Sequence, residues 1–388
     1  MKSDFIPLSA PVLRGREWEY VKECLDTNWV SSVGPFVDRF EAEFAERIGV
    51  EHAVAVVNGT AALHLALIAA GIGAGDEVLV SDLTFIAPVN AIRYVGAYPV
   101  LVDAEPDYWQ MDTDRLSTFL HDGCVEDNGA LVNRQTGRRV KAIIPVHILG
   151  QAVDMDPVIG LADKFGLTLI EDASESLGAK YRGRAVGSMG RLSCFSFNGN
   201  KIITTGGGGM IATNDPALAQ RVRHLSTQAK ADPVEYLHDD IGYNYRLTNI
   251  AAAMGCAQLE NLDAYMAEKH RIAAAYAAGL SDIAGVSIMP AAPGTDGTFW
   301  MYTILIDPAA YGMDSRALLK ALQAQGIQTR PLWQPLHMSA PHRDCEFTGG
   351  KITKRLYAEA LSLPCSVDLD SAAQKRVIGA IRQKAVMS

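Results

Sequence analysis

The sequence is poor in the features that mark several classes of protein. Its six cysteines are scattered, and none forms a C-x-x-C pair, so neither a disulfide framework nor a structural zinc site is expected. No apolar run approaches the roughly 18–20 residues that a transmembrane helix needs. The segment MKSDFIPLSAPVL lacks the apolar core of a secretory signal peptide. We therefore expect a cytoplasmic protein with reduced thiols, without a metal site and without membrane contact.

Charge of one sign is not concentrated anywhere in the chain. Charged residues make up 20% of the sequence without a long single-sign run, so little of it should be disordered. The net charge of −9 would repel nucleic acid over most of the surface. We expect no nucleic-acid partner, and an anionic ligand would need a local group of amides or cations.

Short β-rich runs alternate with helical stretches from about residue 53 onward. Near-continuous apolar strands separated by helices indicate a parallel sheet that is covered on both faces. In such sheets ligands bind beyond the carboxyl ends of the strands, where polar groups follow three of these runs, at 58–60, 147–151 and 171–176. The predicted strands are 53–57, 76–80, 98–103, 141–147 and 167–172.

The pattern changes past residue 200. The segment 246–280 reads as one long helical stretch, and 298–333 suggests a second α+β unit. With 388 residues, 48% of them hydrophobic, the chain can build a large and a smaller domain. We place the boundary near residue 250, which predicts a large domain over 1–250 and a small domain over 251–388.

The segment 121–140 interrupts the alternation of strands and helices. It contains DNG and QTG, which are turn signals. We expect a surface hairpin there, and the sequence does not indicate its role.

Two groups at the predicted strand ends could bind a charged ligand. Free N–H groups of a helix that opens at Thr60 would suit a phosphate, helped by the helix dipole and by the missing Cβ of Gly59. An ordinary Asn-Gly turn with Thr60 as N-cap explains the same residues. Asp172 ends a buried strand and needs a partner or a proton. It could pair with a protonated heterocycle nitrogen, cap a helix or form a structural ion pair.

Lys201 lies in FSFNGNKIITTGGGGM, between small polar residues and four glycines. It is either a solvated loop residue or a desolvated nucleophile toward carbonyls. Ser196 offers a hydroxyl to a phosphate, and Phe85 could cover a flat ring or pack in the core. A phosphate turn, a strand-end acid and a lysine together fit pyridoxal phosphate, which needs a phosphate clamp, a partner for its ring nitrogen and a lysine that forms a Schiff base.

Six segments, taken together, resemble the DegT/DnrJ/EryC1/StrS family of sugar aminotransferases. This resemblance implies a fold-type-I, pyridoxal-phosphate-dependent α/β enzyme. Its large domain would hold a mostly parallel sheet covered by helices, followed by the smaller C-terminal α+β domain. The segments are NWVSSVGPFVDRFE (28–41), NGTAALHLAL (58–67), EDASESLGA (171–179), SFNGNKIITTGGGGM (196–210), GYNYRLTNI (242–250) and TRPLWQPLH (329–337).

The resemblance also implies roles for single residues. Lys201 is similar to the Schiff-base lysine, and Asp172 would face the pyridine nitrogen. Phe85 would stack on the ring, while Gly59, Thr60 and Ser196 would hold the phosphate.

Two further residues imply an active site shared across a homodimer, and one departs from the family pattern. Asn244 resembles an asparagine that reaches the phosphate from the neighbouring subunit. Arg246 resembles the arginine that takes a carboxylate of the amino donor. Glu175 stands three residues after the pyridine aspartate, where many relatives have Gln or His, and it would lie near the ring hydroxyl.

Three segments, TNWVSSVG, TRPLWQPLH and LYAEALSLPCSV, most resemble the branch that acts on UDP-linked 4-keto-6-deoxy-N-acetylhexosamines and makes precursors of bacillosamine and legionaminic acid. That branch would use L-glutamate to aminate C4 of the sugar, giving 2-oxoglutarate. The alternative is a GDP-perosamine-type transaminase acting on GDP-4-keto-6-deoxymannose. Lys201 argues against a dehydratase, because the dehydrating members have His in its place.

Five residues are candidates for holding the nucleotide sugar. Trp29 could stack on a ring, although burial explains a tryptophan equally well. His337 could touch the sugar, although a structural histidine is as good an explanation. The candidates are Trp29, Ser31, Arg330, Trp333 and His337.

Overall fold

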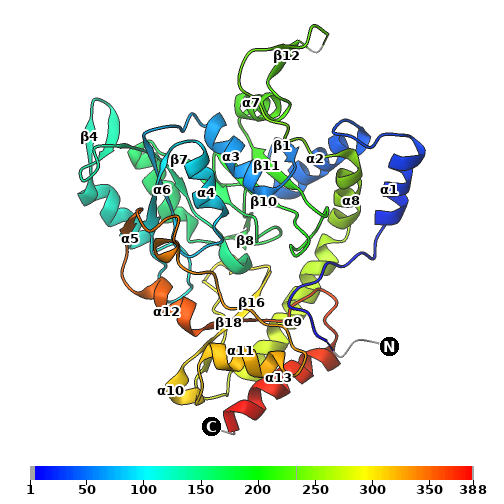
Figure 1. Ribbon diagram of the computed structural model, residues 1–388, viewed down its shortest axis with the longest axis vertical. Coiled ribbons are helices and arrows are strands. Elements are labelled where there is room, and N and C mark those ends of the chain that lie inside the picture. Colours follow the sequence, from blue (N-terminus) through cyan, green and yellow to red (C-terminus); the bar gives the residue numbers. More distant parts are fainter. Residues whose placement is uncertain (1–4, 233, 387–388) are drawn as a thin grey trace.

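The computed structural model describes residues 5–232 and 234–386 (Figure 1). Its centre is a mostly parallel sheet in the order β1-β11-β10-β7-β6-β2-β3-β17, with the hairpin β4–β5 attached beside β6. Among the described strands of this path, β11 runs opposite to all the others, since it pairs antiparallel with both β1 and β10 while the remaining pairs are parallel. The strands of this sheet are β1 (His52–Val56), β2 (Asp76–Ser81), β3 (Tyr98–Val102), β4 (Cys124–Asp127), β5 (Ala130–Asn133), β6 (Arg139–Ile144), β7 (Thr168–Asp172), β10 (Leu192–Ser196), β11 (Gly209–Thr213) and β17 (Glu346–Thr348).

The five predicted strands lie within three residues of β1, β2, β3, β6 and β7. Their burial explains the apolar runs, because almost every residue of these strands is shielded by helices. β10 and β11 were not predicted. The prediction relied on strands that alternate with helices, and no helix lies between β7 and β10 along the described chain. The predicted surface hairpin is present as β4–β5, and its turn places Asn128 and Gly129 at positive φ.

Helices cover this sheet. α3 packs on β10 and β11, and α2 packs on β1. The bounds are α1 (Glu17–Asp26), α2 (Pro35–Ile48), α3 (Gly59–Ala69), α4 (Ala87–Tyr94), α5 (Thr113–Thr118), α6 (Met155–Phe165) and α7 (Pro216–Ser226).

The predicted long helix over 246–280 is two helices, α8 (Asn249–Leu259) and α9 (Leu262–Leu280). They contact different parts of the molecule, because α8 packs on α1 and α2, whereas α9 packs on α13 (Ser371–Val386). The domain boundary near 250 stays a prediction, and residues 1–4 and 387–388 of the two predicted domains lie outside the described residues.

The C-terminal part holds a small antiparallel sheet, β14-β16-β18, with helices beside it in the lower half of Figure 1. A separate two-stranded hairpin, β12–β13, projects at the top of the figure. Within the described residues no helix combines the length and apolar character that crossing a bilayer requires. The remaining bounds are β8 (Lys180–Tyr181), β9 (Arg184–Ala185), β12 (Lys230–Asp232), β13 (Leu237–His238), β14 (Val286–Ser287), β15 (Thr295–Asp296), β16 (Tyr302–Ile306), β18 (Ala360–Leu363), α10 (Pro308–Tyr311), α11 (Ser315–Gln323) and α12 (Ile352–Glu359).

Candidate active site

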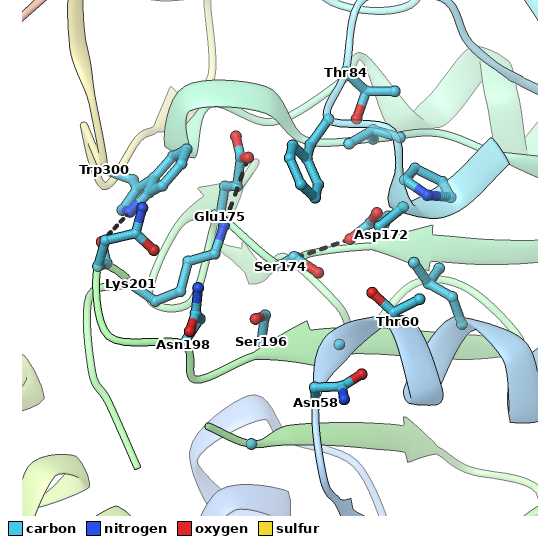
Figure 2. Close-up of a pocket in the computed structure, with 18 of the residues that line it drawn as sticks. Asn58, Thr60, Thr84, Asp172, Ser174, Glu175, Ser196, Asn198, Lys201 and Trp300 are labelled. Carbon is cyan, nitrogen blue, oxygen red and sulfur yellow. Dashed lines mark hydrogen bonds and ion pairs between the residues drawn. The ribbon is translucent and has the colours of Figure 1, made fainter. Parts of the chain in front are cut away.

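A cavity of about 380 Å³ opens at the carboxyl ends of β7 and β10, beside the first turn of α3 (Figure 2). Parallel strands bring their carboxyl ends to one edge of a sheet, so residues far apart in sequence meet there. Eight of the predicted site residues line this cavity: Gly59, Thr60, Phe85, Asp172, Glu175, Ser196, Lys201 and Trp333.

The first turn of α3 forms the floor of the cavity. Its N-cap is Asn58, whose Oδ1 accepts a hydrogen bond from the Ala61 N–H at 2.8 Å. This corrects the alternative in which Thr60 caps the helix, since the helix begins at Gly59 and Thr60 is its second residue. Among the described residues, the amides of Gly59 and Thr60 have no hydrogen-bond acceptor, so they are available to an anion.

Gly59 is the residue that lets α3 approach β10 so closely. A Cβ on this glycine would lie 2.8 Å from Cβ of Ser196 and 3.2 Å from Oγ of Ser174. The three residues therefore make a narrow cradle of amides and hydroxyls, which a methyl group would fill. Its size and its donors suit a phosphate.

Asp172 and its neighbour Glu171 end β7 on opposite faces, as the two-residue period of a strand requires. Glu171 is saturated, since its carboxylate accepts from His147 Nε2 and from the amides of Gly187 and Met189, among others. These contacts hold the pKa of Glu171 low against the opposing effect of burial. Glu171 is therefore a structural acid that ties the loop after β9 to the sheet.

Asp172 faces the cavity instead and has few partners. Its Oδ1 accepts from the Ser174 N–H at 3.1 Å, and burial raises its pKa, partly offset by the Ser174 contacts and by the charge of Lys201. Among the described residues no cation lies within ion-pair distance of it, and it caps no helix. A buried carboxylate without a cationic partner would be stabilised by a protonated nitrogen of a ligand.

Lys201 is withdrawn from bulk solvent, with 13% of its side chain exposed. Its Nζ lies 3.6 Å from Oε1 of Glu175 and 3.9 Å from the centroid of the Trp300 indole ring. Figure 2 shows the side chain directed toward Glu175 inside the cavity. The solvated-loop alternative is thus wrong.

Glu175 is almost fully buried between the lysine and the backbone of Leu149. Its Oε2 accepts from the Leu149 N–H at 2.8 Å, and burial raises the pKa of Glu175 to about 7, with the Lys201 charge acting in the opposite direction. At neutral pH this group is therefore available both as a proton donor and as a carboxylate.

Two aromatic residues from different parts of the sequence line the rest of the cavity. Phe85 has 54% of its surface exposed, so it is free to contact a flat ligand rather than packed in the core. Trp333 is stacked parallel to Trp300, with ring centroids 6.4 Å apart and an interplanar angle of 7°. Both offer π faces to a ligand.

The structure does not bring Asn244 and Arg246 into the cavity of their own chain. Asn244 is exposed, whereas Arg246 is 8% exposed and its Nη1 donates to Glu41 Oε1 at 2.7 Å and to the Ala55 carbonyl at 3.0 Å. Within one chain Arg246 is therefore a buried ion-pair partner. The predicted roles of both residues require a neighbouring subunit and stay predictions.

The remaining sugar-site candidates lie outside the cavity lining. Trp29 is 49% exposed, so burial does not explain it, and Ser31 and Arg330 are exposed as well. His337 is held by Asp82, whose Oδ2 lies 2.7 Å from Nδ1, and its ring stacks on Phe347. The structural alternative accounts for His337 in this chain.

Several cavity residues were not predicted from the sequence. Ser174 and Asn198 lie inside segments that already carried a prediction, so their position next to Asp172 and Lys201 could have indicated them. Trp300 comes from just before β16 and had no such signal, because only the tertiary fold brings it to Lys201. The unpredicted lining residues include Thr84, Ser174, Asn198, Asn200 and Trp300.

Comparison with known proteins identifies the family. The sequence model of the DegT/DnrJ/EryC1/StrS aminotransferase family matches residues 11–382. The chain is 43% identical over 379 residues to a GDP-perosamine synthase from Caulobacter vibrioides, which covers 97% of this chain and 98% of the relative. A GDP-perosamine synthase from Escherichia coli O157:H7 is also 43% identical, over 86% of each chain. A family aminotransferase from Brucella abortus has a solved structure with a TM-score of 0.87 and 31% identity, over 95% of each chain.

The chain belongs to the DegT/DnrJ/EryC1/StrS aminotransferase family. It is therefore a pyridoxal-phosphate-dependent nucleotide-sugar aminotransferase with the expected fold-type-I α/β architecture. The expected UDP-sugar branch gains no support from the curated relatives, because three of them, at 40–43% identity, are GDP-perosamine synthases.

The cavity fits the cofactor of this family. The cradle at Gly59 accommodates a phosphate, Asp172 is a buried carboxyl without a cationic partner among the described residues, and the Lys201 amine lies in the same space. Phe85 adds an exposed aromatic face. Phosphate clamp, ring-nitrogen partner and amine are the three groups that pyridoxal phosphate requires.

Proposed function

We propose that the chain transfers the amino group of L-glutamate to C4 of GDP-4-keto-6-deoxymannose, giving GDP-perosamine and 2-oxoglutarate. The observation that carries the chemistry is the meeting of Lys201, Asp172 and the first turn of α3 around one cavity. The 43% identity to GDP-perosamine synthases over nearly the whole chain favours this sugar nucleotide over a UDP-linked one.

The proposed roles follow from the contacts. The amides of Gly59 and Thr60 and the hydroxyl of Ser196 bind the cofactor phosphate, and Asp172 keeps the ring nitrogen protonated. Once bound, the cofactor supplies a carbonyl that exchanges amines and a ring that draws electrons from the reacting carbon.

Lys201 has two tasks in this proposal. It holds the cofactor covalently in the resting enzyme, and after release its Nζ accepts and returns the proton that the reacting carbon exchanges. Glu175, 3.6 Å from that Nζ, keeps the free amine inside the cavity. Phe85 covers the ring.

We also propose a homodimer in which Asn244 and Arg246 act on the active site of the neighbouring subunit. Support comes from Asn244, which is exposed and outside its own cavity, and from the hairpin β12–β13, which projects from the body of the chain with exposed Tyr236 and Leu237. Arg246 would have to exchange its Glu41 partner for the donor carboxylate, or share its guanidinium between the two.

The substrate assignment is tested with purified enzyme, L-glutamate and a panel of GDP- and UDP-linked 4-keto-6-deoxy sugars, with formation of 2-oxoglutarate as the signal. The proposal predicts turnover of the GDP-mannose derivative at a kcat/KM at least about 100-fold above that for the UDP-linked N-acetylhexosamines. A preference for the UDP sugars would overturn the assignment while leaving the aminotransferase chemistry intact.

A further inference from the structure

The Lys201 amine is held between a carboxylate and an aromatic face. Its Nζ lies 3.6 Å from Glu175 Oε1 on one side and 3.9 Å from the Trp300 ring centroid on the other. An ammonium over the face of an indole is attracted by the negative face of the ring, most strongly where water is excluded. Trp300 is only 5% exposed, so this contact is largely dry.

Trp300 is fixed to the loop that carries the lysine. Its Nε1–H donates to the carbonyl of Asn200 at 2.6 Å, one residue before Lys201. Its ring is parallel to that of Trp333 on the cavity wall. The indole therefore cannot move without moving the backbone next to the lysine or breaking a partly buried hydrogen bond.

A second lysine holds Trp300 from behind. Lys269, on α9, is 3% exposed, and its Nζ donates to the carbonyls of Trp300 at 2.8 Å and Cys365 at 2.5 Å. No carboxylate of the described residues lies within ion-pair distance of Lys269, and burial lowers its pKa. A buried lysine is rarely retained without a carboxylate, and here both hydrogen bonds of Lys269 go to backbone carbonyls, one of them that of the cavity residue Trp300.

The backbone on the far side of Trp300 is strained. Phe299 has φ of 47° and Leu149 has φ of 60°, although neither residue is a glycine. Their two segments meet where the Thr298 N–H donates to the Gly150 carbonyl at 2.8 Å. Gly150 permits this contact, because a Cβ there would lie 2.7 Å from the Trp300 nitrogen. Strain of this kind is kept where the surrounding structure has to hold a group in one place.

We propose that Trp300 is a positioning residue for the Lys201 amine, and that Lys269 fixes Trp300 by binding its carbonyl. The inference rests on the proposed function of Lys201. Trp300 would keep Nζ in one position whenever it is not bonded to the cofactor, so that the bond re-forms quickly in each turnover. Preorganisation of this kind acts on rates rather than on affinity.

The test measures how fast the cofactor-free full chain attaches pyridoxal phosphate. As Nζ bonds to the aldehyde carbon and water leaves, visible absorption develops and gives the rate. Pyridoxine 5′-phosphate, which has an alcohol in place of the aldehyde, measures non-covalent affinity in the same cavity. We expect Trp300→Leu to slow attachment about 10-fold or more, while the affinity for pyridoxine 5′-phosphate changes by less than about 3-fold.

Three further variants complete the design. Trp300→Phe keeps an aromatic face over the amine and should restore most of the rate. Trp109→Leu truncates another buried tryptophan, outside the cavity lining, and should attach cofactor at the wild-type rate. Lys269→Met should slow attachment in the same direction as Trp300→Leu, and if it does not fold, the Trp300 variants alone decide.

The outcomes separate this inference from the proposed function. Suppose that wild type attaches the cofactor at Lys201. If Trp300→Leu then attaches it equally fast, or if its attachment rate falls only as much as its affinity for pyridoxine 5′-phosphate, the positioning role is wrong and the proposed function stands. If wild type forms no covalent bond at Lys201, the proposed function itself fails. In the loaded enzyme, Trp300→Leu should lower kcat and leave the KM for glutamate within about 3-fold.

Discussion

The cavity has two walls that are built in different ways. The central sheet supplies the first wall, with Asp172 and Ser196, and the C-terminal part supplies the second, with Trp300. Asp172 and Ser196 stand at the ends of β7 and β10, so the strands themselves fix their positions. Trp300 instead depends on contacts with Asn200 and Lys269, which are distant in sequence. We propose that the chemistry of the reaction belongs to the first wall and that the placement of the Lys201 amine depends on the second.

The largest expected effect comes from the sheet wall. Lys201→Ala should keep the fold and lower turnover by at least about 1,000-fold, because both covalent attachment and proton transfer are lost. The assay follows 2-oxoglutarate without any added amine. Lys180→Ala, which removes an exposed lysine of β8, should match wild type. Appreciable transamination by Lys201→Ala would contradict the role.

Substitution of the two neighbouring acids at the end of β7 should have opposite effects: one variant should lose activity and the other should lose stability. Asp172→Asn removes the charge that the ring nitrogen needs, so kcat should fall about 100-fold while the melting temperature stays close to wild type. Glu171→Gln turns an amide donor toward His147 and the Gly187 N–H, and should cost about 2–4 kcal/mol of stability. Equal effects on stability and rate in both variants would refute this division.

Glu175 joins the two walls, and its protonation should make stability pH-dependent. Its pKa is raised by burial to about 7, above that of an unfolded glutamate. The folded chain therefore keeps a proton that the unfolded chain has lost, and the resulting stability is present at low pH and is lost as pH rises through 7.

Thermal unfolding of the cofactor-free chain between pH 5 and 8 tests this expectation. Wild type should lose about 2 kcal/mol more than Glu175→Gln over that range. Parallel curves for the two proteins would show that Glu175 ionises at its ordinary pKa.

The smallest expected effect concerns the phosphate cradle. Gly59→Ala places a Cβ 2.8 Å from Cβ of Ser196, so the α3 amides should move and the affinity for pyridoxal phosphate should fall about 10-fold. Gly73→Ala is the matched control, because its Cβ would meet nothing within 4 Å. Unchanged cofactor affinity in Gly59→Ala, measured by fluorescence titration, would place the phosphate elsewhere.

The same contrast explains how much could be predicted from the sequence. Residues at strand ends were predictable, since an apolar run locates the strand and the next polar residue must reach the edge of the sheet. Asp172 and Gly59 belong to this group, whereas Lys201 was predicted from its position between small polar residues and four glycines. Trp300 was not predictable, because its role depends on a contact with Lys201 across about a hundred residues of chain. Arg246 shows a different limit of prediction from sequence. Its motif predicts that it binds a carboxylate of the amino donor, but within one chain its guanidinium is paired with Glu41.

The antiparallel strand β11 was missed for a related reason. Its residues, GMIAT, follow a run of glycines that reads as a loop, and only pairing with β1 and β10 makes them a strand. The sheet topology therefore contains information that no local pattern carries.

The central claim is that Lys201 is the amine that holds the cofactor. Borohydride reduction of the purified coloured enzyme, followed by peptide mass spectrometry, tests it most directly. The account predicts that the cofactor mass is carried by the peptide containing Lys201 and that Lys201→Ala yields no labelled peptide. Labelling of Lys269 or of any other lysine, with Lys201 unmodified, would contradict it.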